Sequence, residues 1–233
     1  MTLIDRPKRL PFTPLQIAIH VGTWGELGWI AFDFFTHRLT VNPLQDMQQR
    51  TGRIAITLLV LSLACTPLSH LLGWRELLKR SRTLGLYAFM VATMHVLIFL
   101  DLDNGIAWNF FEQTIVQKPY ILLGMAAFLM LIPLAMTSFD IWKVRFGKRW
   151  KRLHQLVYLI VPVTVLHYAL AAKGDLLRLM GNILRPLIYA LIVILLLTLR
   201  LPRVRRFVGG LRDRIALLWA SRVGTNTQPT PHP

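Results

Sequence analysis

The sequence has a single cysteine among its 233 residues, and this scarcity limits its metal and redox chemistry. Cys65 has no second thiol to pair with, which excludes an intramolecular disulfide and any multi-cysteine metal site. The motif Cys-x-x-Cys-His is also absent, which excludes covalent attachment of a c-type haem. Redox chemistry in this chain would therefore need another cofactor.

The sequence also lacks the local signatures of soluble nucleotide-binding and hydrolytic modules. It contains no G-x-G-x-x-G unit, no P-loop and no nucleophile elbow. Glycines at 22, 25 and 28 have a different spacing, and we expect them to allow close helix packing. A redox protein without its own nicotinamide module must exchange electrons through partners, so these absences indicate a membrane subunit.

Apolar residues make up 54% of the chain, and the mean hydropathy is +0.48, which is too apolar for an ordinary soluble domain. A membrane-spanning helix needs about 20 mostly apolar residues. Six such stretches can be found without overlap, at 15–35, 52–72, 83–101, 119–139, 153–172 and 183–201. The sequence therefore predicts an all-α integral membrane protein, a six-helix transmembrane bundle with no separate soluble domain.

Acidic residues are few, with 11 Asp and Glu against 27 Lys and Arg, and the formal net charge is +16. In a soluble protein this excess would suggest nucleic acid binding, but here the charges lie between the apolar stretches. The membrane side that holds both termini carries 20 Lys and Arg, and the other side carries 7. The positive-inside rule then predicts cytoplasmic termini and no nucleic acid partner.

The predicted organisation has three parts. Residues 1–14 form a cytoplasmic N-terminal segment, 15–201 the transmembrane domain, and 202–233 a basic cytoplasmic tail. The tail alternates apolar residues with arginines, a pattern suited to lying on an anionic membrane surface. Membrane lipid is therefore an expected partner of the tail.

Histidines within the predicted spans are the main candidate functional residues, because ionisable groups inside a membrane are costly and usually functional. His95 lies 13 residues after Arg82, and His167 lies 15 residues after Arg152. At 1.5 Å per residue these depths are about 20 and 22 Å, so the two side chains are level. Haem iron is commonly held by histidines on facing helices, and we predict that His95 and His167 are the two axial ligands of a b-type haem.

His154 is a candidate ligand of a second haem near the opposite surface, about 20 Å from His167. Thirteen residues at about 100° each, however, leave the two histidines roughly 140° apart around an ideal helix. A kink at Pro162 could restore the alignment. His20 or His70 could complete a site with His154.

Other readings of these polar residues stay open. Each histidine could be a packing residue that hydrogen-bonds across helices. The chain could also be a proton- or metal-coupled transporter, whose polar path would comprise His20, Glu26, Asp33 and His95. Such transporters often contain inverted repeats, and the two three-helix halves show no convincing duplication. A cofactor-free scaffold is a third reading, against which the level histidine pair argues.

Several short motifs follow one another in a specific order along most of the chain. They are Asn42-Pro43, Thr51-Gly52-Arg53, Thr66-Pro67-Leu68, Arg82-Thr83-Leu84-Gly85-Leu86, Lys118-Pro119-Tyr120, Thr137-Ser138, Gly147-Lys148-Arg149-Trp150, Leu153-His154 and His167-Tyr168. In these motifs the sequence resembles the MsrQ family, formerly YedZ. Members are haem-binding membrane subunits of the bacterial periplasmic methionine-sulfoxide reductase system.

The resemblance implies a ferric-reductase-like transmembrane domain with haem ligands on the third and fifth spans. His95, His154 and His167 fall on the family's haem histidines, which implies one or two b-type haems. It also implies that electrons pass from the quinone pool or a cytosolic flavin reductase to MsrP, a periplasmic molybdopterin enzyme that reduces methionine sulfoxide. The chain would then be an electron-transfer subunit of the bacterial inner membrane rather than the catalyst. An FMN site is attributed to the family, and no motif in the sequence locates one.

Overall fold

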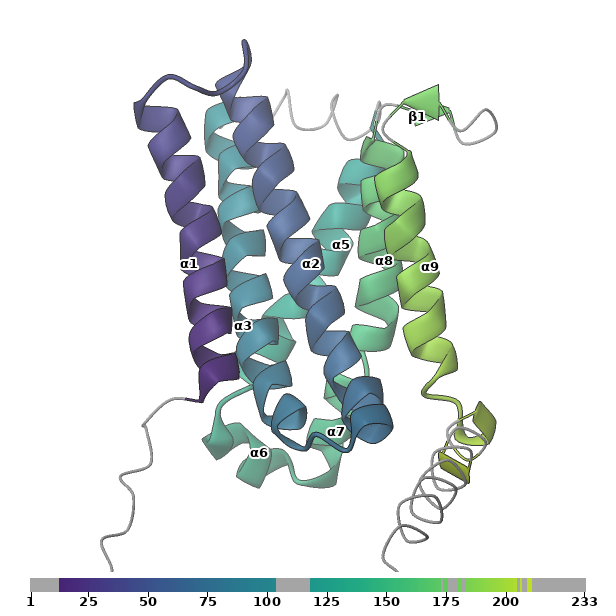
Figure 1. Ribbon diagram of the computed structural model, residues 1–233. Coiled ribbons are helices and arrows are strands. Elements are labelled where there is room, and N and C mark those ends of the chain that lie inside the picture. The colour runs from purple at the N-terminus through teal and green to yellow at the C-terminus, as the bar shows by residue number, and fades with distance from the viewer. Residues whose placement is uncertain are drawn as a thin grey trace, which may run out of the picture.

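The computed structural model describes residues 13–103, 118–172, 174–175, 180–181, 183–204, 206 and 209–210. These residues form a bundle of helices with one short pair of antiparallel strands (Figure 1). The elements are α1 (Pro14–Phe35), α2 (Pro43–Leu72), α3 (Glu76–Leu97), the π-helix η1 (Ile98–Asp103), α5 (Tyr120–Met136), α6 (Asp140–Phe146), α7 (Lys148–His154), α8 (Val157–Ala171), β1 (Gly174–Asp175), β2 (Met180–Gly181) and α9 (Leu184–Thr198).

The protein is a helical membrane protein, as predicted. By length and composition, three helical segments can cross a membrane, namely Pro43–Leu72, Glu76–Leu100 and Lys148–Ala171. A fourth crossing is possible if α5 and α6, which meet at a bend of 90°, count as one span. Helix α9 is apolar but only 15 residues long, and α1 is not among the described helices that pass this test. Hydropathy and helix length together thus support three or four of the six predicted spans.

Helix α2 begins nine residues before the predicted start of the second span. The side chain of Asn42 accepts a hydrogen bond from the backbone N–H of Gln45, and Pro43 occupies the first helical position. Both are strong helix-start signals, but the first two turns are polar and therefore invisible to a search for apolar runs. The helix continues through Pro67 to Leu72 and ends at Gly73, which adopts the left-handed conformation that favours glycine.

The fifth predicted span is interrupted in the structure. Helix α7 ends at His154 and α8 begins at Val157, so the break lies at residues 155–156. Pro162 lies within α8, five residues after its first residue. A two-residue turn thus separates His154 from His167 along this span, in addition to the proline that the sequence suggested.

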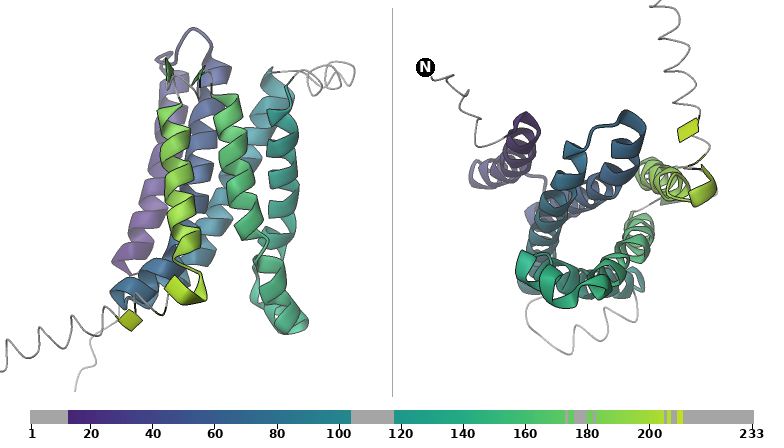
Figure 2. Two further views of the ribbon diagram at one scale, coloured as in Figure 1. Left: turned by 90° about the vertical axis from the view of Figure 1, so that its right-hand side faces the viewer. Right: turned by 90° about the horizontal axis from the view of Figure 1, so that it is seen from below.

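The four helices α2, α3, α5 and α8 form the centre of the bundle. Helix α2 packs along α3, and α5 packs along α8, while α1 lies outside against α2 and α3 and α9 lies outside against α8 and α2 (Figures 1 and 2). The start of α1 and the end of α9 lie at the same end of the bundle as α6 and α7 (Figure 1). The C-terminal parts of α3 and α8, which carry the level histidines, therefore lie towards the opposite end.

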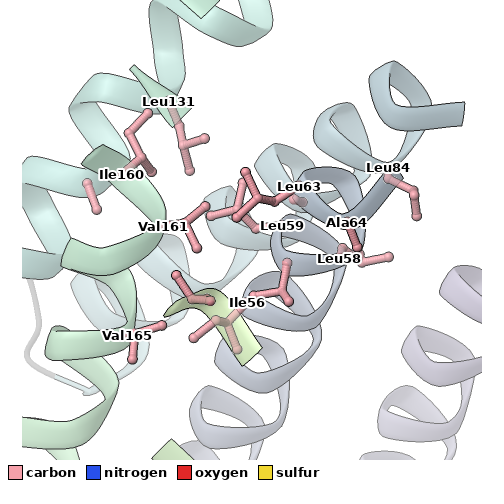
Figure 3. Close-up of a cluster of buried hydrophobic side chains, with 14 of the residues drawn as sticks. Ile56, Leu58, Leu59, Leu63, Ala64, Leu84, Leu131, Ile160, Val161 and Val165 are labelled. Atoms are coloured by element: carbon pink, nitrogen blue, oxygen red, sulfur yellow. The ribbon is translucent and has the colours of Figure 1, made fainter. Parts of the chain in front are cut away.

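The apolar core joins α2 to α8 across the centre of the bundle. Ile56 and Leu63 on α2 and Ile160 and Val161 on α8 are almost completely buried, and Figure 3 shows them in one cluster. Val91 on α3 is fully buried in the same cluster. Helices inside a membrane associate largely through close packing of this kind, so this core fixes how the two helix pairs face each other.

Polar contacts attach α1 to the rest of the bundle. Asp33, almost fully buried, accepts a 2.6 Å hydrogen bond from the guanidinium of Arg50, which also pairs with Asp46 at 3.1 Å. Nearer the start of α1, His20 hydrogen-bonds the hydroxyl of Tyr87 on α3. Two of the polar residues that distinguish the first predicted span thus serve as contacts between helices.

Candidate functional site

His95 and His167 face each other between α3 and α8. Their ring centroids are 6.4 Å apart, and the ring planes make an angle of 83°. His95 lies in the last turn of α3, and His167 lies four residues before the end of α8, so the helix ends set both rings at the same level. The depth argument from sequence therefore identified two residues that the fold brings together.

Both histidines have the same hydrogen-bonding arrangement. Nδ1 of His95 lies 2.9 Å from the carbonyl oxygen of Gln48, and Nδ1 of His167 lies 2.7 Å from that of Tyr120. A carbonyl only accepts, so Nδ1 must carry the proton and donate it in each case. The lone pair is then on Nε2. Histidines that ligate metals usually donate their other ring N–H to such an acceptor, which fixes the ring and the tautomer.

The two rings line a cavity of about 320 Å³ whose walls come mainly from α2, α3, α5 and α8. Its walls are mainly apolar, with Ile56, Val96 and Phe128 among the lining residues. A volume of this order and a lining of this kind are typical of sites for small molecules and cofactors. The cavity is therefore a candidate cofactor site in which two imidazoles are the available metal ligands.

Three cationic residues line the same cavity and were not predicted as site residues. Arg53 belongs to α2, Lys118 precedes α5, and Arg185 lies in the first turn of α9. These cationic side chains could pair with carboxylate groups of a ligand, because Arg and Lys form charge-assisted hydrogen bonds with carboxylates.

His154 is separate from this cavity. It is the last residue of α7 and is not among the described residues that line the cavity. Its ring stacks on Trp150 with centroids 4.0 Å apart, and its Nδ1 lies 3.1 Å from the Trp150 carbonyl oxygen. Nε2 is buried near the carbonyl of Leu134, without a hydrogen bond of good geometry. His154 thus has one buried ring nitrogen without a hydrogen bond of good geometry, and it shares no site with the level pair.

No group of three or more His, Cys, Asp or Glu side chains that could hold a metal ion occurs within the described residues. The pair of His95 and His167 can supply two ligands. A tetrapyrrole that brings its own four nitrogens fits such a pair, whereas a bare ion would need further protein ligands.

The fold and this site define a class of ferric-reductase-like transmembrane proteins. Residues 51–165 match the family model described as "Ferric reductase like transmembrane component", a stretch that includes His95 and His154 and ends two residues before His167.

Individual relatives are more specific. A protein of Rhodospirillum rubrum is 40% identical over 197 residues, which cover 84% of this chain and 91% of the relative. A protein of Caulobacter vibrioides is 37% identical over 171 residues, covering 73% and 81%, and one of Xanthomonas campestris pv. campestris is 36% identical over 188 residues, covering 78% and 83%. Each is named "Protein-methionine-sulfoxide reductase heme-binding subunit MsrQ". The chain belongs to the MsrQ family, which confirms the resemblance seen in its motifs.

Proposed function

We propose that this protein is a b-type cytochrome subunit of a methionine-sulfoxide reductase system, with His95 and His167 as the axial ligands of one haem. The observation that carries the proposal is the matched pair of histidines, each fixed by an Nδ1–H hydrogen bond to a backbone carbonyl. The names of the relatives, which describe haem-binding subunits, support the choice of cofactor.

The residues present fit a haem held between two imidazoles. Two imidazoles that shared one iron would need ring centres about 6 Å apart. The observed separation is 6.4 Å. A bound haem would supply reversible one-electron oxidation and reduction of its iron. The protein would hold the two nitrogens, fix their tautomers and surround the site with mainly apolar side chains.

The cationic residues of the cavity are suited to the charged edge of a haem. Haem carries two propionate carboxylates, and burying these charges without partners would be costly. Arg53, Lys118 and Arg185 offer three positive charges from three different parts of the chain. We propose that they would pair with the propionates of a bound haem.

The membrane arrangement proposed for the chain keeps the six spans and the three parts predicted from sequence. In it α1 and α9 also cross the membrane, both termini are cytoplasmic, and the protein lies in the bacterial inner membrane. The start of α1 and the end of α9 at one end of the bundle, together with the 20-to-7 division of Lys and Arg, support this orientation. The level histidines would then lie nearer the periplasmic side. The predicted tail lies mostly outside the described residues.

This orientation supports transfer of electrons towards the periplasm. We propose that the donor is the quinone pool or a cytosolic flavin reductase and that the acceptor is the molybdopterin enzyme MsrP, which performs the reduction of methionine sulfoxide. The names of the relatives call them subunits of a protein-methionine-sulfoxide reductase, which supports a partner of this kind. They mention haem and no flavin, so FMN stays a prediction from the family resemblance.

A second haem on His154 is the extended form of the proposal. It is supported by the family resemblance and by the absence of a hydrogen bond of good geometry at Nε2 of His154. The transporter reading has less support, because Asp33 and His20 of its polar path contact Arg50 and Tyr87 between helices.

The proposal is tested with the full-length protein purified in detergent. Oxidised and dithionite-reduced spectra should show the Soret and alpha bands of a b-type haem, and His95→Ala and His167→Ala should each remove the same haem. His37→Asn is the control, because His37 is exposed and Asn tolerates its positive φ of 54°. A wild-type protein without these bands contradicts the proposal, and a His95 or His167 variant with full haem content contradicts the pairing.

The same preparation counts the haems. His154→Ala should lower the haem-to-protein ratio and leave the spectrum of the His95 and His167 haem unchanged. An unchanged ratio would limit the protein to one haem.

A further inference from the structure

Each of the two facing histidines packs against a glycine of a neighbouring helix. A Cβ atom built on Gly52 of α2 would lie 3.1 Å from Cε1 and 3.3 Å from Nδ1 of His95. A Cβ atom built on Gly124 of α5 would lie 2.7 Å from Cε1 and 2.8 Å from Nδ1 of His167. Side chains larger than hydrogen would occupy space that the imidazole rings now use.

The two contacts are copies of one local arrangement. In each, a helix provides a carbonyl that accepts from Nδ1 and, four residues later, the glycine under the ring: Gln48 with Gly52, and Tyr120 with Gly124. The histidine follows the glycine by 43 residues in both cases, and the second arrangement lies 72 residues after the first. Helices α2 and α3 thus repeat in α5 and α8 the way in which a histidine is held.

Four residues make slightly more than one helical turn, so the carbonyl and the glycine lie on the same face of the helix. The carbonyl holds Nδ1 from one turn, and the missing side chain at the next turn lets the ring lie against the backbone. Together they restrict both the position and the rotation of the imidazole. The two rings, held in this way at the cavity that both of them line, are nearly perpendicular to each other at 83°.

We propose that Gly52 and Gly124 are positioning residues that set the distance and mutual rotation of the His95 and His167 rings as a pair of haem ligands. The inference rests on the proposed haem function but concerns residues that do not touch the iron. At 2.7 Å from the ring, a methyl group on Gly124 forces His167 to move, and the 2.7 Å bond to the Tyr120 carbonyl is then lost or bent. At Gly52 the contact of 3.1 Å requires a smaller displacement.

The test compares Gly124→Ala and Gly52→Ala with Gly28→Ala and Gly85→Ala in the full-length protein. All four glycines lie within helices, so alanine raises helix propensity in each variant. A Cβ at Gly28 meets nothing within 4 Å, and one at Gly85 makes an ordinary 3.5 Å contact with Ser62. The four variants therefore differ mainly in whether the new methyl group meets a histidine.

The main measurements are haem affinity, the reduction potential, and the electron paramagnetic resonance spectrum of the ferric haem, which depends on the angle between the axial imidazole planes. Gly124→Ala should lower haem affinity by about 10- to 100-fold, the range found when groups that orient metal ligands are removed. Gly52→Ala should lower it less. Both should shift the spectrum and the potential, whereas the two control variants should match the wild type.

Chemical modification of the apoprotein separates this inference from the proposed function. Diethyl pyrocarbonate modifies accessible imidazole nitrogens, and peptide mass spectrometry reads the site. In the apoprotein, His167 of Gly124→Ala should react several-fold faster than His167 of the wild type. This expectation does not depend on whether the protein binds haem. If the wild type binds no haem but this difference is found, the proposed function fails and the positioning role stands.

Three results would overturn the inference. The first is a Gly124→Ala protein with unchanged haem affinity, spectrum, potential and His167 reactivity. The second is equal loss of folded protein in all four glycine variants. The third concerns a Gly124→Ala protein that does not fold, in which case Gly52→Ala decides. A Gly52→Ala protein that also fails to fold, or that has the haem affinity, spectrum and potential of the wild type, contradicts a positioning role.

Discussion

Replacement of Asp33 by Asn tests whether the polar residues of α1 attach this helix to the bundle. Asp33 accepts a 2.6 Å hydrogen bond from Arg50, and the two side chains are 9% and 26% exposed. Removing one partner of a fully buried ion pair costs about 3–5 kcal/mol. Arg50 is partly exposed and keeps Asp46 as a second partner, so we expect Asp33→Asn to lower the free energy of unfolding by about 1–3 kcal/mol.

Asp140→Asn is the matched control for this prediction. Its partner Arg82 lies 2.8 Å away, but the two side chains are 79% and 41% exposed, so the loss should stay below about 1 kcal/mol. Unfolding is measured by denaturant titration in mixed micelles, and a double-mutant cycle with Arg50→Gln isolates the coupling between Asp33 and Arg50. If the coupling is absent and Asp33→Asn resembles Asp140→Asn, α1 is not held by this pair. A transport path through Asp33 would then regain support, and ion uptake by vesicles would measure it.

Two further predictions concern the core and the cavity. Ile160→Ala should lower the free energy of unfolding by about 2–5 kcal/mol, because Ile160 is fully buried between helices. Leu191→Ala is the control: this side chain is 68% exposed, and its loss should cost less than about 0.5 kcal/mol. Denaturant titration measures both variants, and equal losses would contradict the packing. Arg53→Gln and Arg185→Gln should each lower haem affinity about tenfold through loss of a charge-assisted bond, with Lys151→Gln, outside the cavity, as the control. Haem titration of the apoprotein tests this, and wild-type affinity in both variants would exclude their role at the propionates.

Local sequence patterns predicted the helical elements well and their ends poorly. Apolar runs locate the parts of helices that lie in lipid, but α2 begins at Pro43 and α3 at Glu76, both well before the predicted spans. The extra turns are polar, so only the capping signals at Asn42 and Pro43 indicate the start of α2. The bend after α5 and the break after His154 were also not visible in hydropathy.

The sequence likewise predicted some residues of the candidate site and missed others. His95 and His167 were identified together because depth along a span follows from counting residues at a fixed rise. The same counting predicted that His154 and His167 would not share a face, and the structure leaves His154 outside the cavity. The cations were missed because Arg53, Lys118 and Arg185 come from distant parts of the chain. The glycines had a detectable signal, since the interval of 43 residues from glycine to histidine occurs twice, at 52 to 95 and at 124 to 167.

The sequence by itself determined that this is a helical membrane protein, which family it belongs to, and which two histidines lie at one depth. These properties follow from composition, from the order of motifs and from the spacing of residues along the chain. Only the tertiary structure decided that the carbonyls of Gln48 and Tyr120 hold the imidazoles and that Gly52 and Gly124 lie beneath them. Such contacts depend on how helices rotate and approach one another, and packing between helices sets that geometry.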